Sequence, residues 1–203
     1  MDPNWYPALQ SIENYSLAIN RTKNWRDLYE REFKLTDEQR DDAGNLWTDY
    51  QLADQTLVPF YEGIPEVIRE LKSISHGIVS QNSNQIITQQ LKENGLIDYF
   101  GSVIGYEEVE FAKQKPQPDG LIMCIEELTK LKPGLAIYIG DHESDVHCAF
   151  NANQVFKDEN IDIEIISVGA FYIDGTDDSN WTMKPNFKAK NTKDILEIMN
   201  NFR

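Results

Sequence analysis

Two carboxylates, four positions apart, follow a predicted strand. The run Leu135–Ile139 is apolar, as in a buried strand of a parallel sheet, and it leads through Gly140 to Asp141 and Asp145. In open α/β sheets, ligands bind beyond the carboxyl ends of the strands. Two acids at this spacing can share one face of the next helical turn and bind a hard cation through oxygen. The alternative is that Asp141 only caps that helix, and the short pattern by itself leaves both readings open.

A hydroxyl and several amides follow an earlier predicted strand. That strand, residues 76–80, ends in Ser80, and Gln81 and Asn82 come just before a helix predicted to begin at Asn84. Free backbone N–H groups and the helix dipole favour negative charge at a helix start. We therefore expect Ser80, Gln81 and Asn82 to bind an anion. The alternative is an N-cap and a turn, which need no ligand.

Lys115 lies in the proline-containing loop Lys113–Pro118. Proline restricts the backbone, so this loop can aim one ammonium group at a phosphate. The alternative is a solvated surface lysine, the usual fate of this residue type. Together with Ser80 and the two aspartates, Lys115 completes a set of a donor, a cation and a metal-binding pair.

The elements that must position these residues alternate between strand and helix. Strands are predicted over residues 76–80, 102–105, 135–139 and 163–168, and helices over 63–71, 84–94, 118–130, 145–152 and 193–202. Such alternation is typical of a doubly wound parallel sheet. The predicted fold class is therefore α/β, with a Rossmann-like parallel core.

The first part of the chain has only helical patterns, from Asn4 to about Asp54. Thr36 and Gln39 match a capping box that opens a helix running past Trp47. Its apolar residues Ala43, Leu46, Trp47 and Tyr50 recur on one face, which we interpret as a packing stripe and not as a cofactor site. We predict two domains, an all-helical one over residues 1–57 and an α/β core over 58–203.

Charge and composition exclude several classes of protein. Charged residues make up 26% of the 203 and the net charge is −15, so neither nucleic acid nor an anionic membrane is an expected partner. Cys124 and Cys148 lie in predicted helices without metal-site spacing, and we expect both to be reduced and at least half-buried. The sequence contains no apolar run of membrane-spanning length and no signal-peptide pattern. We therefore expect a cytoplasmic protein.

The order of these motifs resembles the haloacid dehalogenase-like superfamily, within it the phosphoglycolate phosphatase-like branch with a helical cap. The matches are the strand ending in Ser80, the loop Lys115–Pro118, and Gly140-Asp141-His-Glu-Ser-Asp145. Supporting matches are Pro59–Gly63 and Gly95–Phe100. The likeness covers nearly the whole chain, and the ordered set is far more specific than any one motif.

The resemblance implies a Mg²⁺-dependent phosphatase acting on a small phosphorylated metabolite. By it, Ser80 would hydrogen-bond the phosphoryl group, Lys115 would neutralise its charge, and Asp141 would hold Mg²⁺ with support from Asp145. Residues 1–57 would be a mobile cap that closes over the substrate.

One family motif is missing from this sequence. Family members open with a buried strand ending in Asp-x-Asp-Gly-Thr, whose first aspartate is the covalent nucleophile. Here the sequence begins Met1-Asp-Pro-Asn-Trp5, and no Asp-x-Asp pair precedes the helical segment. A partial echo, Phe171–Thr176, has tyrosine at the position of the nucleophile, and we interpret it as an ordinary loop.

Two functional readings follow from this gap. The first is a phosphatase that is nearly inactive as this chain, and the second is a non-catalytic phosphate- or partner-binding relative. The missing strand would lie in the middle of the sheet, and losing its side chains would remove on the order of 10 kcal/mol of apolar burial. We expect another segment or a second chain, as in a homodimer, to fill its place, or the flanking strands to close up.

Overall fold

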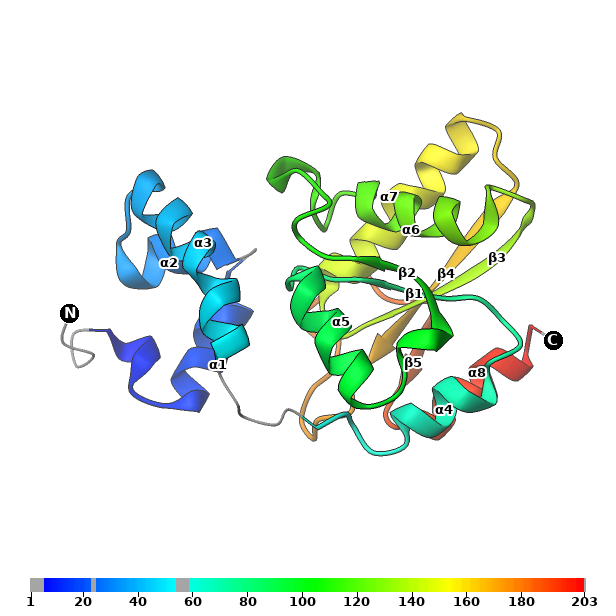
Figure 1. Cartoon of the computed structure of the whole chain (residues 1–203), viewed down its shortest axis with the longest axis horizontal. Helices are drawn as coiled ribbons and strands as arrows, with labels where there is room; N and C mark the ends of the chain where they lie inside the picture. The colour runs from blue at the N-terminus through cyan, green and yellow to red at the C-terminus, as the bar shows by residue number, and fades with distance from the viewer. Residues whose placement is uncertain (1–5, 23–24, 54–58, 203) are drawn as a thin grey trace. The chain divides into compact units, whose positions relative to one another are not determined.

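The computed structural model describes residues 6–22, 25–53 and 59–202 (Figure 1). The chain divides into two compact units, residues 1–56 and 57–203. Asn4 and Trp5, at the start of the predicted helical segment, lie outside the described residues, and so does the predicted boundary between residues 57 and 58.

The first unit is helical throughout its described residues. It contains a short 3-10 helix, η2 (Pro7–Leu9), and the helices α1 (Ile12–Asn20), α2 (Trp25–Phe33) and α3 (Asp37–Ala53). The predicted capping box at the start of α3 is confirmed. The Thr36 N–H donates to Gln39 Oε1 at 3.0 Å, and the Gln39 N–H donates to Thr36 Oγ1 at 3.4 Å.

The small core of this unit is built around Leu28, with Ala8 and Ala18. The prediction of a packing stripe on α3 is wrong for its large residues, because Leu46, Trp47 and Tyr50 are 52%, 44% and 71% exposed. A different face of α3 meets α2: a side chain at Gly44 would collide with the Trp25 ring. Helical periodicity identified an apolar face, but it could not tell which face the neighbouring helix covers.

The second unit is an α/β structure whose described strands all pair in parallel. The strands are β1 (His76–Val79), β2 (Phe100–Ile104), β3 (Gly134–Gly140), β4 (Ile163–Ala170) and β5 (Phe187–Ala189). The helices are α4 (Ile64–Glu70), α5 (Asn84–Glu93), α6 (Asp119–Thr129), α7 (Glu143–Asp158) and α8 (Thr192–Asn200), with short 3-10 helices η3 (Ile97–Tyr99) and η4 (Phe111–Lys113). The predicted fold class is therefore confirmed. Strand β5 was not predicted, because three residues are too few to show a period.

The strands form two separate sheets, β1–β2 and β3–β4–β5. Ile78 pairs with Val103 in the first sheet, and Ile137 pairs with Ile166 in the second. Within the described ranges, no strand lies between β1 and β3 and no strand hydrogen bond joins them. The sequence predicts a missing strand at this position, and no described segment takes its place.

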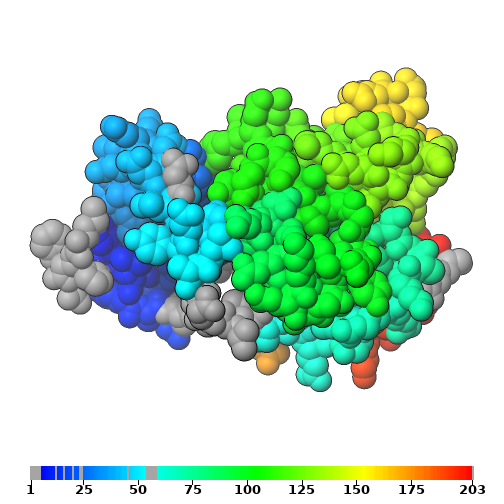
Figure 2. Space-filling view, viewed as in Figure 1, coloured from blue at the N-terminus to red at the C-terminus, as the bar shows by residue number. Residues whose placement is uncertain are grey.

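Helices cover both faces of the strands (Figure 1). Helices α6 and α7 lie on one face and share a core with Val79 of β1, Ala136 and Tyr138 of β3, and residues of β4. On the other face, α4 and α8 pack against β4 and β5, and α5 packs against β1 and β2. In the space-filling view, the green segment that contains α5 forms much of the visible surface of this unit (Figure 2). One helical layer, α6 and α7, thus spans both sheets and holds their strands in one orientation.

Candidate functional site

Lys115 and Asp145 form an ion pair at the carboxyl end of β3. Lys115 Nζ lies 2.7 Å from Asp145 Oδ1, and the side chains are only 15% and 6% exposed. Lys115 comes from the loop before α6, and Asp145 from the first turn of α7. The alternative of a solvated surface lysine is therefore wrong. Burying two charges is costly unless they are paired, and these two are.

Asp145 has further partners in the protein. Its Oδ2 accepts the His142 N–H at 3.0 Å, and the Tyr138 hydroxyl lies 3.3 Å from its Oδ1. His142 is the N-cap of α7, and its ring accepts the Ser144 N–H at 3.1 Å. Burial, together with the nearby Asp145 charge, raises the pKa of Tyr138 well above its usual value. Tyr138 is therefore a hydrogen-bond donor at neutral pH.

The loop after β1 is held together by its own polar groups. The Asn82 N–H donates to Ser80 Oγ at 3.0 Å, and the Ser83 N–H donates to Asn82 Oδ1 at 3.0 Å. Glu107 accepts from the Ser83 hydroxyl and, at 2.9 Å, from the Asn84 N–H at the start of α5. The N–H groups of Asn82, Ser83 and Asn84 therefore have partners within the protein, and the anion site expected here stays a prediction. The alternative of an N-cap and a turn fits residues 82–84, because the Glu107 carboxylate of the protein itself already binds at the start of α5.

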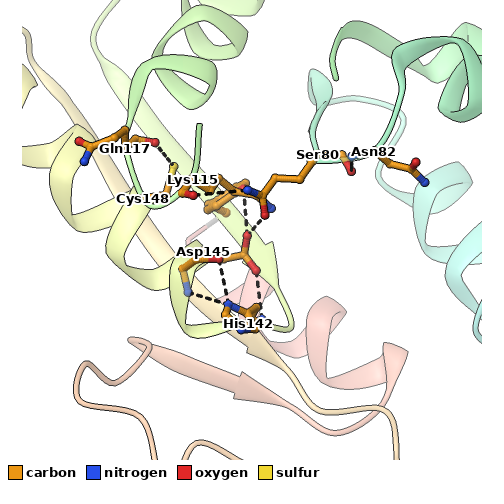
Figure 3. Close-up of polar contacts among 10 residues, drawn as sticks. Ser80, Asn82, Lys115, Gln117, His142, Asp145 and Cys148 are labelled. Carbon is orange, nitrogen blue, oxygen red and sulfur yellow. Dashed lines mark hydrogen bonds and ion pairs between the residues drawn. The ribbon is translucent and has the colours of Figure 1, made fainter. Parts of the chain in front are cut away.

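Ser80, Gln81 and Lys115 nevertheless meet in one pocket. Its other lining residues are Val79, Ile104, Gly105, Val109, Gln114 and Gly120. The Gln81 side-chain amide donates to the Lys115 carbonyl at 3.5 Å. Figure 3 shows Lys115 between Ser80 and Asp145. The structure thus brings three predicted residues together, whereas Asn82 supports the loop behind Ser80.

Asp141 comes directly after β3 and is exposed. It does not cap α7, since His142 has that role, so the capping alternative for Asp141 is wrong. Asp141 is exposed at the carboxyl end of the strand, four residues before the buried Asp145. The oxygens of Asp145 already accept from Lys115 and His142. No cluster of three or more His, Cys, Asp or Glu with metal-site geometry occurs in the described ranges.

Both cysteines are buried and neither forms a disulfide, as predicted. The Cys148 thiol donates to the Gln117 carbonyl at 3.3 Å, next to the Lys115 loop. Burial raises the pKa of Cys148 to about 12, although the Lys115 charge opposes the rise. A thiol with such a pKa is neutral at physiological pH, so Cys148 packs and does not act as a nucleophile.

Sequence reasoning missed four residues that shape this site. Tyr138 contacts Asp145, Glu107 and Glu108 fix the loop after β1 to that after β2, and Gln114 lines the pocket. Gln114 Oε1 is buried and has no partner among the described residues. Glutamates directly after a predicted strand were the available signal for Glu107 and Glu108, but the same spacing is common in solvated loops.

A model of the haloacid dehalogenase-like hydrolase family matches residues 10–156 of the sequence. The chain belongs to this family. The match runs from the helical segment through the Lys115 loop to the end of β3 and into α7. The resemblance drawn from the three motifs is therefore confirmed.

Curated proteins similar in sequence to this chain include a pyrophosphatase and a phosphoglycolate phosphatase. The pyrophosphatase PpaX of Listeria welshimeri is 31% identical over 145 residues, which are 70% of this chain and 60% of PpaX. A phosphoglycolate phosphatase of Vibrio vulnificus is 29% identical over 122 residues, 59% of this chain and 52% of that enzyme. The chain thus spans only about 50–60% of these two relatives.

Solved structures of the haloacid dehalogenase-like family have the same fold. A haloacid dehalogenase-like hydrolase from Bacteroides fragilis superimposes with a TM-score of 0.71 at 21% identity, covering 92% of this chain and 84% of that one. A phosphoglycolate phosphatase-like structure from Lactobacillus plantarum gives 0.72 at 18% identity, covering 91% and 81%. None of the helices in the described ranges has the length and apolar character of a membrane span.

Proposed function

We propose that this haloacid dehalogenase-like protein is a phosphomonoesterase-type protein that binds the phosphate group of a small metabolite at the Ser80–Lys115 pocket. The observation that carries this proposal is the meeting of Ser80, Gln81 and Lys115 in one pocket at the carboxyl ends of β1 and β2. Ser80 and Gln81 follow β1, whereas Lys115 lies in the loop before α6, so two loops that are distant in the sequence meet at this pocket. A hydroxyl donor and an ammonium suit a phosphoryl group.

The roles of these residues follow from their contacts. Ser80 Oγ accepts the Asn82 N–H, so its own O–H is left to donate to a phosphoryl oxygen. Asp145 holds the Lys115 ammonium at 2.7 Å, which fixes one of the three ammonium protons and leaves the others for an anion. Asp145 therefore acts on the substrate through Lys115.

Mg²⁺ is the cofactor that we propose for the carboxyl end of β3, where Asp141 follows the strand. Asp141 fits such an ion, since it is an exposed carboxylate at the carboxyl end of β3, and Mg²⁺ is often bound by one or two carboxylates plus substrate phosphates. Asp145 supports the metal site indirectly, because its oxygens already accept from Lys115 and His142. When bound, Mg²⁺ would neutralise charge on the phosphoryl group.

We propose that the 203-residue chain by itself hydrolyses phosphate esters very slowly. No Asp-x-Asp pair precedes its helical unit, and loss of a covalent nucleophile lowers kcat by about 10⁴ to 10⁶-fold. The helical residues 1–57 would act as the cap, and residues 58–203 as the core. We also propose that the protein is cytoplasmic and that its partners are small phosphorylated metabolites.

Phosphate binding and aryl phosphate hydrolysis test the proposal on the intact chain. With Mg²⁺ present, we expect binding of inorganic phosphate, measured by calorimetry, and little release of nitrophenol from p-nitrophenyl phosphate. Ser80→Ala should weaken phosphate binding by about tenfold, since it removes one hydrogen bond to a charged ligand and keeps the Lys115–Asp145 pair. Asp141→Asn should abolish the dependence of phosphate binding on Mg²⁺.

The control is Lys113→Met, two residues from Lys115. Lys113 Nζ lies 3.5 Å from Glu110 at the surface, and its side chain is 53% exposed. This variant should bind phosphate like the parent chain. If Lys113→Met and Lys115→Met weakened phosphate binding equally, only the general positive charge would matter. Absence of phosphate binding by the parent chain would refute the pocket. Rapid Mg²⁺-dependent turnover that Asp141→Asn abolishes would refute the claim of slow hydrolysis and favour an active enzyme over a non-catalytic binding protein.

A further inference from the structure

The segment between β4 and β5 leaves the sheet next to Asp141. Gly140, the last residue of β3, pairs with Gly169 near the end of β4, so these two parallel strands end at the same edge of the sheet. Asp141 follows β3 directly, and residues 171–186 follow β4. We call residues 171–186 the β4–β5 loop. This loop and Asp141 therefore start from neighbouring strand ends.

The β4–β5 loop binds Glu143, which comes two residues after Asp141. Glu143 Oε1 accepts the Thr182 hydroxyl at 2.6 Å and the Met183 N–H at 3.0 Å, and it also accepts the Thr182 N–H. Three donors from two consecutive residues thus meet at one carboxylate oxygen. Although burial raises the pKa of Glu143, these hydrogen bonds lower it overall, as expected when they bind the charged form.

Buried contacts hold the β4–β5 loop in place. The Asp178 side chain is only 6% exposed, and its Oδ1 lies 2.7 Å from Lys188 Nζ of β5. The Trp181 ring packs against the Phe171 ring, with 5.3 Å between the ring centroids. Both contacts lie within the loop or join it to β5. The donors that reach Glu143 therefore belong to a segment with its own fixed structure.

The turn that contains Asp141 is held from two sides. On one side, Asp145 Oδ2 accepts the His142 N–H at 3.0 Å, and Lys115 holds Asp145 through its ammonium group. On the other side, Glu143 joins the turn to the β4–β5 loop. The Asp141 carboxylate is exposed and has no hydrogen bond or ion pair within the described part of the chain. Its position therefore depends on the backbone that these neighbours fix.

We propose that Glu143 is a positioning residue for the metal site. By binding residues 182–183 of the β4–β5 loop, it holds the turn at residues 140–142 so that the Asp141 carboxylate can bind Mg²⁺. This inference rests on the proposed function, which assigns Mg²⁺ to Asp141. Residues that orient a metal ligand affect metal affinity without touching the ion. Glu143 thus fixes the ligand and does not supply a second carboxylate to the metal.

Mg²⁺ binding to the full chain tests this inference. Glu143→Ala removes the acceptor and should weaken Mg²⁺ binding by about tenfold, measured by calorimetry with inorganic phosphate present. Glu143→Gln keeps an acceptor oxygen on a side chain of the same length, and it should retain most of the affinity. If the Glu143 charge acted on the ion directly, Glu143→Gln would lose as much affinity as Glu143→Ala. That result would overturn the inference.

Hydrogen exchange without metal provides a readout that needs neither Mg²⁺ nor activity. The His142 amide, which donates to Asp145, reports whether the turn opens. It should exchange about tenfold faster in Glu143→Ala than in the parent chain, and nearly at the parent rate in Glu143→Gln. An unchanged His142 exchange rate in Glu143→Ala would overturn the inference, because the turn would then not depend on Glu143.

Asn153→Ala is the control for general loss of stability in the same helix. Asn153 bonds to the backbone of Ile165 in β4, about three helical turns after Glu143. This variant should bind Mg²⁺ like the parent chain, and a loss as large as that in Glu143→Ala would overturn the inference. If the parent chain itself bound no Mg²⁺, the proposed metal site would fail and this inference with it. That failure is distinguishable, because it appears before any substitution is made.

Discussion

Lys115 Nζ lies 2.7 Å from Asp145 Oδ1, although 30 residues separate them in the sequence. The contact joins the loop before α6 to the first turn of α7, two segments that flank β3. Asp145 also accepts from the His142 N–H and lies close to the Tyr138 hydroxyl. One carboxylate therefore fixes the ammonium, the start of α7 and a tyrosine at the same place.

Asp145→Asn should destabilise the protein by about 3–5 kcal/mol, because it leaves the buried Lys115 ammonium without its counter-charge. The free energy of unfolding, measured in urea at neutral pH, checks this. The matched control is Glu66→Gln, since Glu66 pairs with Arg69 at 3.6 Å on the surface. That variant should change stability by less than about 0.5 kcal/mol. Similar losses in both variants would contradict the importance given to the buried pair.

Asn153→Ala should cost about 2–4 kcal/mol, because it leaves both the N–H and the carbonyl of the buried Ile165 without a partner. Asn151→Ala is the control in the same helix. Asn151 donates one bond, at 2.9 Å, to the Pro116 carbonyl at an exposed position. Thermal and urea unfolding should place this control within about 1 kcal/mol of the parent chain. An Asn153→Ala variant as stable as the Asn151→Ala one would show that water replaces the Asn153 cap.

Glu143 should make folding stability pH-dependent below its unfolded pKa of 4.5. Burial opposes ionisation, but hydrogen bonds from Thr182 and Met183 prevail and lower the pKa of Glu143. A depressed carboxyl pKa gives stability that is present above pH 4.5 and is lost as the pH falls through the folded value. Urea unfolding of the parent and of Glu143→Gln should therefore differ most at neutral pH, and the difference should shrink in acid. A constant difference would rule out this contribution.

Cys124 and Cys148 should resist thiol reagents in the folded protein. Burial raises the pKa of both thiols, that of Cys148 to about 12, so little thiolate forms at neutral pH. In buffer, a colorimetric disulfide reagent should quickly label less than one thiol per chain on average. In urea, it should label both thiols. Cys148→Ser provides the assignment, because it should remove one of the slowly reacting thiols. Rapid labelling of both thiols in the folded chain would show that the α6–α7 layer opens readily.

Much of this fold could be predicted because its signals are local. Runs of apolar residues marked β1, β3 and β4, and the Thr36–Gln39 pair marked the start of α3. Strand β5 was not predicted, since three residues are too few to show a period. The apolar face of α3 was wrongly predicted to be packed, since an apolar pattern does not show whether a neighbouring helix covers that face.

The sequence alone determined the alternation of strands and helices, the family, and the order of Ser80, Lys115 and Asp141, because periodicity and motif spacing are properties of neighbouring residues. Only the tertiary structure decided that Asp145 pairs with Lys115, that Glu107 binds the start of α5, and that the described strands form two separate sheets. Those facts depend on contacts between distant segments, and such contacts leave no periodic trace in the sequence.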